Sequence, residues 1–509
     1  MDFVSSNNQS ISLTDEQEAI VEANDDFMAI TAFAGTGKTY TLKAFAQRRP
    51  RDKMLYLAFN KTLSDEAKVD FWDCPQVEVR TLHSLAYAYA GYKYKDTLGS
   101  FRVLELEKYL KATGLPNKIS IARILYECLN QWMISSDVSI RTFMKGYSKK
   151  VQESLSEHKL SKKDIIPALE LVWKDMLDAK FTMPHNGYFK LFQLSKPELG
   201  SIYKQILVDE AQDLNNAMIS IILGFKGKKI LVGDPYQQIY SWNGAVNALR
   251  KAEKMGAKPY YLTHSFRCPD HIASIANDYL RLLGSKKTFH GDPDGTGPHN
   301  DYPPVIIART NAAIFDFAAR FLDSHKIFYK GGFDSFQFEI LKDINHLKNG
   351  NNNRISDPFI SRFKNHESLE SYVKDAIDIP MRVRLEVEKK YGQQVHTIFN
   401  AMRYKQSKNE MDADVVISTA HKIKGQEYGK VRLLEDFVEL TDVLDRGIRY
   451  RDNKTKYVPV TISREEFQLL YVAITRAFGQ LELPLRYRIN ESSITSFQKL
   501  VKKGNIVLT

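Results

Sequence analysis

The chain has 509 residues, of which 43% are hydrophobic and 26% are charged, and this composition is typical of a globular protein with several domains. Its three cysteines are far apart, its N-terminal segment is polar, and no apolar run is long enough to cross a bilayer. These features argue against a disulfide framework, a secretion signal and a membrane partner. We therefore expect a soluble intracellular protein, cytoplasmic and nucleoid-associated in a bacterial or viral host and nuclear in a eukaryotic one.

The charge balance is basic. There are 72 Lys and Arg residues against 61 Asp and Glu residues, which gives a formal net charge of +11. This excess favours a polyanionic partner, of which nucleic acid is the commonest. A basic surface that only keeps the protein in solution gives the same number, so charge alone leaves the partner open.

The first predicted helix begins after Thr14, which is a favourable N-cap residue. Gln17 follows three positions later and completes a capping-box pattern. The same glutamine is a candidate for adenine recognition if a nucleotide site lies next to this helix. Both interpretations of Gln17 stay open at this point.

A phosphate-binding loop lies between a predicted strand at 27–31 and a predicted helix at 40–47. Its residues are Ala32, Phe33, Ala34, Gly35, Thr36, Gly37, Lys38 and Thr39. In such a strand, loop and helix the backbone amides face the phosphates, Lys38 adds positive charge, and the Thr39 hydroxyl can ligate Mg²⁺. Ala32 stands where the general pattern has its first glycine, and a chance glycine turn is the alternative.

Short apolar runs alternate with helical patterns in two parts of the chain. The runs that predict strands are 27–31, 54–59, 77–79, 206–208, 230–232, 305–308 and 415–418. This alternation predicts an α/β fold with parallel sheets that present ligands at the strand carboxyl ends. We expect two α/β cores, each with a helical insertion: 1–85 with 200–255, interrupted by 86–199, and 256–349 with 412–509, interrupted by 350–411.

Two carboxylates follow the predicted strand at 206–208. Asp209 can hold Mg²⁺, and Glu210 is placed to orient and deprotonate a water molecule. An acidic pair after a strand is often only a favourable helix N-terminus. Together with the phosphate-binding loop, however, the pair predicts a nucleotide hydrolase.

At this point the chain resembles a known family. The segment Asp209–Asp213 resembles motif II of the superfamily 1 helicases of the UvrD/Rep/PcrA kind, and 233–245, 262–267, 419–427 and 466–477 resemble motifs III, IV, V and VI. The resemblance runs from Leu13 to about Leu483. It is greatest to the F-box DNA helicase branch, through motif III and residues 434–438, although the chain shows no recognisable F-box. It implies two RecA-like P-loop NTPase cores that use ATP and Mg²⁺.

The resemblance also implies roles for single residues. On the nucleotide side, Gln17 reads adenine, Phe266 stacks on it and Glu427 binds the ribose. Gln237 senses the γ-phosphate from the first core, and Arg267 and Arg476 reach it from the second core, although each arginine alone is as readily a surface ion pair. With Lys38 and Glu210, these last three residues form the implied catalytic set.

On the nucleic-acid side, the resemblance implies a track lined by Asn60, Thr81, His83, Tyr240, Trp242 and His421. Aromatic side chains stack on bases without reading their sequence, and polar groups hold phosphates. A place in the buried core is the alternative for Tyr240 and for Trp242.

Three features depart from the family pattern. Asn243 stands where the family often has arginine, which leaves one DNA contact open. Phe59 comes one position later than the matching aromatic, so base stacking is not assigned to it. The second insertion, 350–411, is shorter than the corresponding subdomain of the family.

The resemblance implies an ATP hydrolase coupled to DNA unwinding, a helicase that moves 3′ to 5′ on single-stranded DNA and acts on partly duplex DNA in repair, recombination or replication. RNA as the polymer and the identity of any protein partner stay open. The closest alternative is a translocase that strips proteins from single strands without unwinding. An alternative of another class is a module that binds ATP to switch a partner surface. A nuclease domain is not expected, because only 484–509 follow the matched region.

Overall fold

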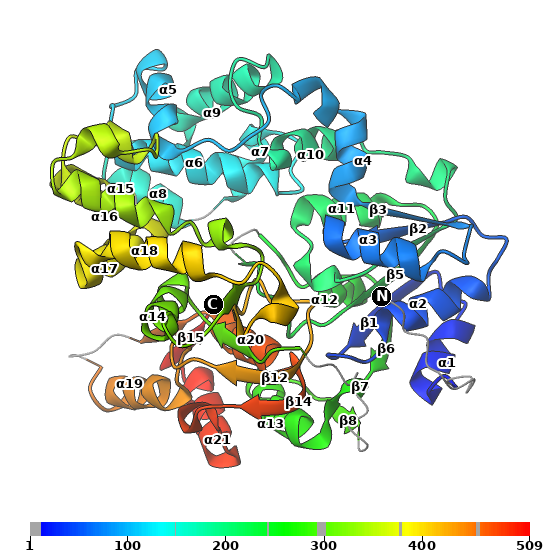
Figure 1. Cartoon of the computed structure of the whole chain (residues 1–509). Coiled ribbons are helices and arrows are strands. Elements are labelled where there is room, and N and C mark those ends of the chain that lie inside the picture. Colours follow the sequence, from blue (N-terminus) through cyan, green and yellow to red (C-terminus); the bar gives the residue numbers. More distant parts are fainter. Residues whose placement is uncertain (1–11, 148, 242–243, 293–301, 376–378, 455–458) are drawn as a thin grey trace.

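The computed structural model describes residues 12–147, 149–241, 244–292, 302–375, 379–454 and 459–509. Within these ranges the chain forms two parallel sheets with helices around them, and two groups of helices that lie on one side of the sheets (Figure 1). This is the α/β architecture of two RecA-like cores, each with a helical insertion, which confirms the predicted fold class.

The first sheet has the strand order β3-β2-β4-β5-β1-β6 in the described residues, and all of its strand pairs are parallel. Its strands are β1 (Phe27–Ala32), β2 (Met54–Ala58), β3 (Val77–Thr81), β4 (Gln205–Val208), β5 (Lys228–Gly233) and β6 (Lys258–Leu262). The phosphate-binding loop follows β1 and the acidic pair follows β4. Both therefore lie at the carboxyl edge of one sheet, as the sequence predicts.

One strand falls outside the predicted first core. The sequence analysis ends that core at residue 255, but β6 pairs with β1 along its whole length, from Met28 beside Lys258 to Ala32 beside Leu262. The first sheet therefore extends to Leu262. Motif IV, 262–267, begins at the last residue of this strand, so the sheet that carries the phosphate-binding loop also fixes the start of motif IV.

The second sheet has the order β10-β11-β9-β12-β14 in the described residues, again with parallel pairs. Its strands are β9 (Val305–Ala308), β10 (Ile327–Tyr329), β11 (Val415–Thr419), β12 (Tyr428–Leu433) and β14 (Ala477–Glu482). Two small parallel ladders accompany it: β7 (His264–Pro269) with β8 (His290–Asp292), and β13 (Val460–Ile462) with β15 (Ile506–Leu508). All seven strands predicted from the sequence are present, with ends within two residues of the prediction.

Helices cover the sheets and build the insertions. Those of the first core are α1 (Asp15–Glu22), α2 (Lys38–Gln47), α3 (Lys61–Asp70), α11 (Asn216–Gly224) and α12 (Ala248–Lys254). Those of the second core are α13 (Asp270–Leu282), α14 (Asn311–Phe321), α19 (Leu440–Asp452), α20 (Arg464–Ile474) and α21 (Glu491–Lys502). Each sheet is thereby buried under helices.

The first insertion contains α4 (Leu82–Tyr89), α5 (Glu107–Ala112), α6 (Ile119–Met133), α7 (Ile140–Gly146), α8 (Lys149–Ser156), α9 (Lys162–Leu177) and α10 (His185–Leu194). The second contains α15 (Glu339–Lys348), α16 (His366–Asp375), α17 (Ile379–Tyr391) and α18 (Gln394–Lys405). Since α15 packs against the other three helices of this insertion, the insertion begins before residue 350, where the sequence analysis starts it.

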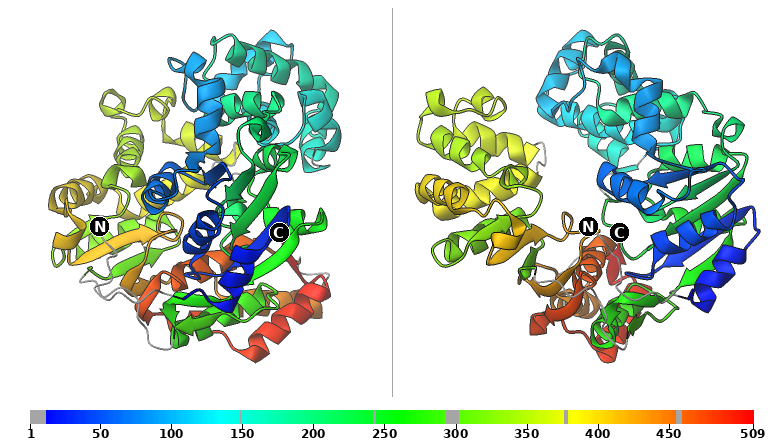
Figure 2. Two further views of the ribbon diagram at one scale, coloured as in Figure 1. Left: turned by 90° about the vertical axis from the view of Figure 1, so that its right-hand side faces the viewer. Right: turned by 45° about the vertical axis from the view of Figure 1, so that its right-hand side comes forward.

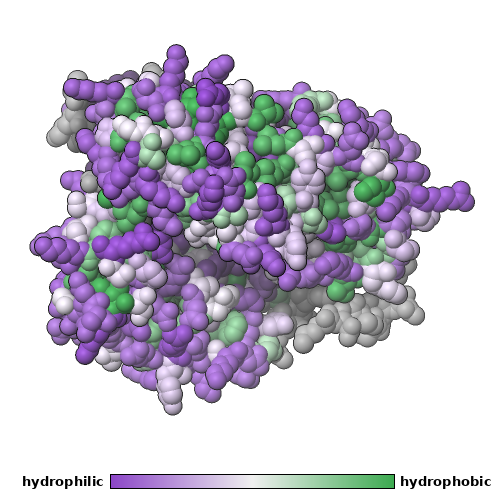
Figure 3. All heavy atoms as spheres, turned by 90° about the horizontal axis from the view of Figure 1, so that it is seen from above, coloured by the Kyte–Doolittle hydropathy of each residue, from purple (hydrophilic) through white to green (hydrophobic). Residues whose placement is uncertain are grey.

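The two insertions touch each other although they interrupt different cores. Arg102 of the first insertion lies 3.4 Å from Asp357 of the second, and its guanidinium stacks 4.5 Å above the Phe359 ring. Views from two further directions show both insertions on the same side of the cores (Figure 2). Seen from above, the side that carries the insertions has small hydrophobic patches among hydrophilic atoms, and the surface there has a recess (Figure 3). No helix in the described ranges is long and apolar enough to cross a membrane.

Candidate nucleotide and nucleic-acid site

The phosphate-binding loop has the backbone that its glycines predict. Gly35 and Gly37 have φ angles of 69° and 73°, a region that strongly favours glycine. A Cβ atom on Gly35 would come within 2.4 Å of the Arg267 Cβ atom, so only glycine lets the second core approach the loop this closely. Thr36 closes the loop by donating a hydrogen bond to the Phe33 carbonyl at 2.9 Å. The loop is therefore a cradle of backbone amides against which Arg267 already lies.

Lys38 and Glu210 face each other across the carboxyl edge of the first sheet, with Lys38 Nζ 3.3 Å from Glu210 Oε1. Burial opposes the charge on both groups. For Lys38, the nearby Glu210, Asp209 and Asp234 outweigh burial and raise its pKa. For Glu210, Lys38 and Lys424 outweigh burial and lower its pKa well below the usual value. Both groups are therefore ionised at neutral pH.

The backbone of Glu210 is strained. Its φ and ψ angles of 50° and 43° lie in the left-handed region, which is uncommon for a residue other than glycine. Strain of this kind persists only where the surroundings fix it, and it is concentrated at functional sites. Here it directs the Glu210 carboxylate toward Lys38.

Asp209 and Thr39, the two predicted Mg²⁺ ligands, meet at one buried phenol. The Tyr56 hydroxyl donates a 2.6 Å hydrogen bond to Asp209 Oδ2, and Thr39 hydrogen-bonds the same tyrosine. Burial, together with the neighbouring Glu210 charge, raises the pKa of Asp209. A divalent cation between the two side chains would offset this cost, so they fit the predicted metal site.

A chain of hydrogen bonds joins the two cores behind the loop. Asp234, after β5, accepts a bond from Gln237 Nε2 at 2.8 Å and one from the Tyr471 hydroxyl of α20 at 3.0 Å. Arg476 donates to Gln237 Oε1 at 3.3 Å. Burial and the neighbouring Arg267 lower the pKa of Arg476 to about 10, so it keeps its charge at neutral pH. The predicted γ-phosphate sensor and one predicted arginine finger are thus in contact.

The other predicted finger, Arg267, forms an ion pair with Glu427, the residue predicted to bind the ribose. Its Nε atom is buried and has no hydrogen-bond partner in the described residues. A guanidinium that has one unused donor and faces a phosphate-binding loop is suited to a further anionic ligand. If a phosphate replaced Glu427 as the partner of Arg267, the Glu427 carboxylate would become available for its predicted role of binding the ribose.

At the other end of the loop, Gln17 and Phe266 lie together as predicted for adenine recognition. Gln17 Oε1 accepts the Thr14 amide at 3.0 Å, which confirms the capping box. Its Nε2 atom is buried, has no partner in the described residues, and lies near Gly37. The Phe266 ring is 42% exposed and also lies near Gly37. A buried amide group beside an exposed aromatic face fits a nucleobase. Gln17 can therefore cap the helix through Oε1 and contact a nucleobase through Nε2.

One cavity of about 410 Å³ gathers the reacting end of the site. All five predicted catalytic residues line it: Lys38, Glu210, Gln237, Arg267 and Arg476. Three of the predicted nucleic-acid residues line the same cavity: Asn60, Tyr240 and His421. Residues predicted for nucleotide and for nucleic acid therefore share one space between the cores.

Tyr240 joins these two groups. Its ring stacks on Phe59 at a centroid distance of 5.6 Å and an interplanar angle of 15°, and its hydroxyl donates to the His421 carbonyl at 3.4 Å. The sequence analysis assigns no stacking to Phe59, and in the structure the partner of its ring is Tyr240. His421 in turn lies 3.4 Å from Glu465. Tyr240 is half-buried, so it belongs partly to the core and partly to the cavity wall.

The remaining predicted track residues lie elsewhere. Thr81 is the N-cap of α4, and its side chain accepts the Ser84 amide. His83 packs on the Phe189 ring at 4.8 Å, and burial lowers its pKa to about 4, so it is neutral at pH 7. Neither residue lines the 410 Å³ cavity. Trp242 and Asn243 lie outside the described residues.

Sequence reasoning missed Lys424 and Tyr471. Lys424 forms an ion pair with buried Asp213, donates to the Gln237 carbonyl at 2.8 Å and lies 5.2 Å from the Tyr240 ring centre. Tyr471 binds Asp234 across the core boundary. Both stand inside segments that resemble motifs V and VI, so the signal was present, but their partners are more than 180 residues away in sequence.

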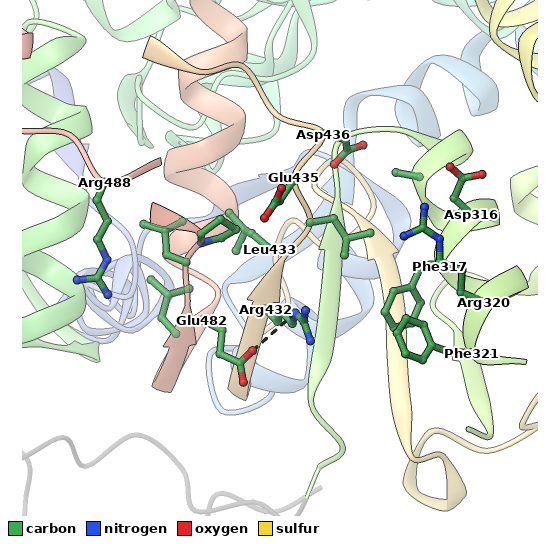
Figure 4. Close-up of a pocket in the computed structure, with 15 residues that line it drawn as sticks. Asp316, Phe317, Arg320, Phe321, Arg432, Leu433, Glu435, Asp436, Glu482 and Arg488 are labelled. Atoms are coloured by element: carbon green, nitrogen blue, oxygen red, sulfur yellow. Dashed lines mark ion pairs between the residues drawn. The ribbon is translucent and has the colours of Figure 1, made fainter. Parts of the chain in front are cut away.

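A second cavity, of about 720 Å³, is separate from this site. It lies between α14 and the ends of β12 and β14. Figure 4 shows the lining residues, with Phe317 and Phe321 on one side of the view and the ion pair of Arg432 and Glu482 in the middle of it. Arg432 Nε lies 3.6 Å from Glu482 Oε2. None of the predicted site residues lines it.

The geometry defines a class of protein. A phosphate-binding loop and an acidic pair on one RecA-like core, faced by two arginines from a second core, make a nucleotide site that is complete only when both cores contribute. Comparison with known proteins agrees, since the model for the UvrD/REP helicase N-terminal domain matches residues 188–255.

Similar proteins extend this match over nearly the whole chain. The F-box DNA helicase 1 of Gallus gallus is 29% identical over 94% of this chain and 49% of its own length. The F-box DNA helicase protein 1 of Schizosaccharomyces pombe is 30% identical over 92% of this chain and 57% of its own length. DNA helicase II of Escherichia coli is 38% identical over 20% of this chain and 16% of its own length. The chain is thus similar to UvrD/REP-type helicases, in part or over most of its length, and it spans about half the length of the first two relatives.

The buried pair of Asp213 and Lys424 gives a prediction for stability. Burial raises the pKa of Asp213 to about 7, against 3.8 for an exposed aspartate, although Lys424 acts in the opposite direction. Between about pH 4 and pH 7 the folded protein therefore binds more protons here than the unfolded chain, and this group makes the fold less stable as the pH rises. As the pH rises through this window, we expect the difference in the free energy of unfolding between Asp213→Asn and wild type to shift in favour of the variant, by at most about 1.4 kcal/mol per pH unit.

Urea unfolding of both proteins at several pH values between 4 and 8 measures this difference. The exposed Asp323→Asn is the control for removing a carboxylate from the surface. Parallel pH profiles for Asp213→Asn and wild type would contradict a raised pKa at Asp213.

Proposed function

We propose that the protein is an ATP-driven motor that moves on single-stranded DNA and unwinds duplex, with ATP and Mg²⁺ as its cofactors. The observation that carries this proposal is the 410 Å³ cavity, which five residues suited to hydrolysis share with three suited to nucleic acid. The printed names of the first relatives, F-box DNA helicases, support DNA as the polymer. The basic net charge of +11 is in keeping with a polyanionic track.

In this proposal each ionised group at the site has one task. Lys38 and the loop amides bind the phosphates, and Thr39 and Asp209 hold Mg²⁺, which neutralises phosphate charge. Glu210 is ionised and orients and deprotonates the attacking water. Arg267 and Arg476 stabilise the negative charge that develops in the transition state. Gln17, Phe266 and Glu427 hold the nucleoside.

The same proposal explains why the site is divided between two cores. Arg267 and Arg476 reach the phosphates only while the cores are together, so nucleotide binding would hold the cores closed and hydrolysis would release them. Asn60, Tyr240 and His421, which come from both cores, would grip the strand alternately. Thr81, His83 and Trp242 would extend this track. Such a cycle moves a polymer by one step for each ATP.

The first experiment measures ATP hydrolysis with and without single-stranded DNA. We expect a strong rise in rate on adding DNA, and loss of hydrolysis in Lys38→Ala, because that change removes a phosphate contact at the mouth of the loop without emptying the core. Circular dichroism checks that the variant is folded. Normal turnover by Lys38→Ala would refute the site, and single-stranded RNA in place of DNA tests the choice of polymer. An ATP-gated binding module would bind ATP without DNA-stimulated turnover.

Arg476 tests the contribution of the second core. Removal of an arginine finger costs about 10³- to 10⁵-fold in turnover. We expect Arg476→Ala to lose DNA-stimulated hydrolysis by at least about 10³-fold while still binding nucleotide, since its partner Gln237 belongs to the other core. Because Arg476 is buried, Arg476→Lys serves as a second variant that keeps the charge but not the fork geometry. Exposed Arg488→Ala is the control. A turnover close to wild type in Arg476→Ala would remove it from the catalytic set.

Direction and unwinding need tailed duplexes. We expect strand displacement from a duplex with a 3′ single-stranded tail and none from one with a 5′ tail, which corresponds to 3′ to 5′ movement. A protein that hydrolyses ATP on both tailed substrates but displaces neither strand would be a translocase, and removal of a bound protein block from the tail would identify it. Preference for the 5′ tail would contradict the proposed direction. A role in repair, recombination or replication follows only from the family.

A further inference from the structure

The end of α4 carries a surface that the proposed site does not use. Tyr89 is the last residue of α4, and Tyr92 lies in the short 3₁₀ helix Gly91–Tyr94 that follows it. The two side chains are 59% and 66% exposed, which is unusual for large aromatic residues. Lys93 and Lys95 stand beside them and are also exposed. Together these four residues form what we call the α4 tip.

The contacts hold the tyrosine rings at the surface. Tyr89 packs its ring against Phe192 of α10 at a centroid distance of 5.6 Å, and Phe192 itself is buried. One part of the Tyr89 ring is therefore fixed by the core while the rest stays in solvent. Lys95 Nζ lies 5.5 Å from the centre of the Tyr92 ring, and no ion pair within the described residues involves Lys93 or Lys95. The α4 tip thus combines exposed aromatic surface with two lysines that form no ion pair in the part of the chain that the structure describes.

The α4 tip lies at the far end of the helix that starts at the proposed track. Thr81 is the N-cap of α4, and His83 lies in its first turn. The proposed function places both residues on the single strand. The helix ends at Tyr89, about 12 Å further along the helix axis. Aromatic rings with interspersed cations are the elements that bind single strands without regard to sequence. An acidic peptide would find the charges but would not use two open rings.

We propose that the α4 tip is an outer extension of the single-strand track, on which Tyr89 and Tyr92 stack bases and Lys93 and Lys95 bind phosphates. This inference rests on the proposed function, because it requires that a strand passes Thr81 and His83. The ligand is single-stranded nucleic acid of any sequence, a few nucleotides beyond those held between the cores. The site would lengthen the grip on the strand without contacting ATP.

Equilibrium binding to two oligothymidylates tests the proposal, one of about 8 nucleotides to fill the track between the cores and one of about 20. We expect the double variant Tyr89→Ala/Tyr92→Ala to bind the long oligonucleotide at least about tenfold more weakly, with unchanged affinity for the short one. Tyr89→Phe/Tyr92→Phe keeps the rings and should bind as wild type. Tyr404→Ala, which removes an 89% exposed tyrosine on α18, is the matched control.

The lysines have a separate signature. Each phosphate contact to a single strand contributes about 0.7 to the slope of log affinity against log salt concentration. Lys93→Ala/Lys95→Ala should therefore flatten this slope by about 1.4 for the long oligonucleotide only. Equal affinity of wild type for both lengths, or wild-type binding by the alanine variants, would overturn the proposal. Absence of any DNA binding or DNA-stimulated hydrolysis in wild type would instead refute the proposed function itself.

Discussion

Charge neutrality inside a buried site is the constraint on which the rest of this structure depends. Four cations, Lys38, Arg267, Lys424 and Arg476, converge between the cores, and a buried charge without a partner is costly. Three of them have carboxylate partners within the chain, Glu210, Glu427 and Asp213 respectively for Lys38, Arg267 and Lys424, whereas Arg476 donates a hydrogen bond to the neutral amide of Gln237. The phosphates of a bound nucleotide would compete with these partners for the cations that lie nearest the loop.

This pairing explains the division of labour between the cores. Lys38 and Glu210 both come from the first core, whereas Arg267 and Arg476 belong to segments that follow the first sheet. The loop can bind phosphate by itself, but the full set of counter-charges exists only when both segments are in place. Tyr471, which reaches Asp234 from α20, strengthens the same junction without any charge of its own. Under the proposed function, closure of the cores and completion of the site are one event.

The sequence predicted what depends on local chemistry and failed where distant segments meet. Gly35, Gly37 and the Thr14 capping box follow from residue types at fixed spacing, and the structure has them. Residues 256–349 are predicted to belong to the second core, yet the strand Lys258–Leu262 pairs with β1. Nothing in these five residues reveals which edge of which sheet they join. The ring of Phe59 shows the same limit, since its stacking partner Tyr240 is far away in sequence.

Under the proposed function, Lys424 offers a physical route from hydrolysis to movement. Its ammonium group contacts the Gln237 carbonyl and Asp213 on the first core and lies over the Tyr240 ring, while the lysine itself is carried by the second core after β11. Gln237 is the proposed γ-phosphate sensor and Tyr240 a proposed strand contact, and only two residues lie between them. A shift of Gln237 on loss of the phosphate would therefore be transmitted to Tyr240 both through the backbone and through Lys424. Because Lys424 holds both the Gln237 carbonyl and Asp213, the two contacts would change together in the proposed cycle.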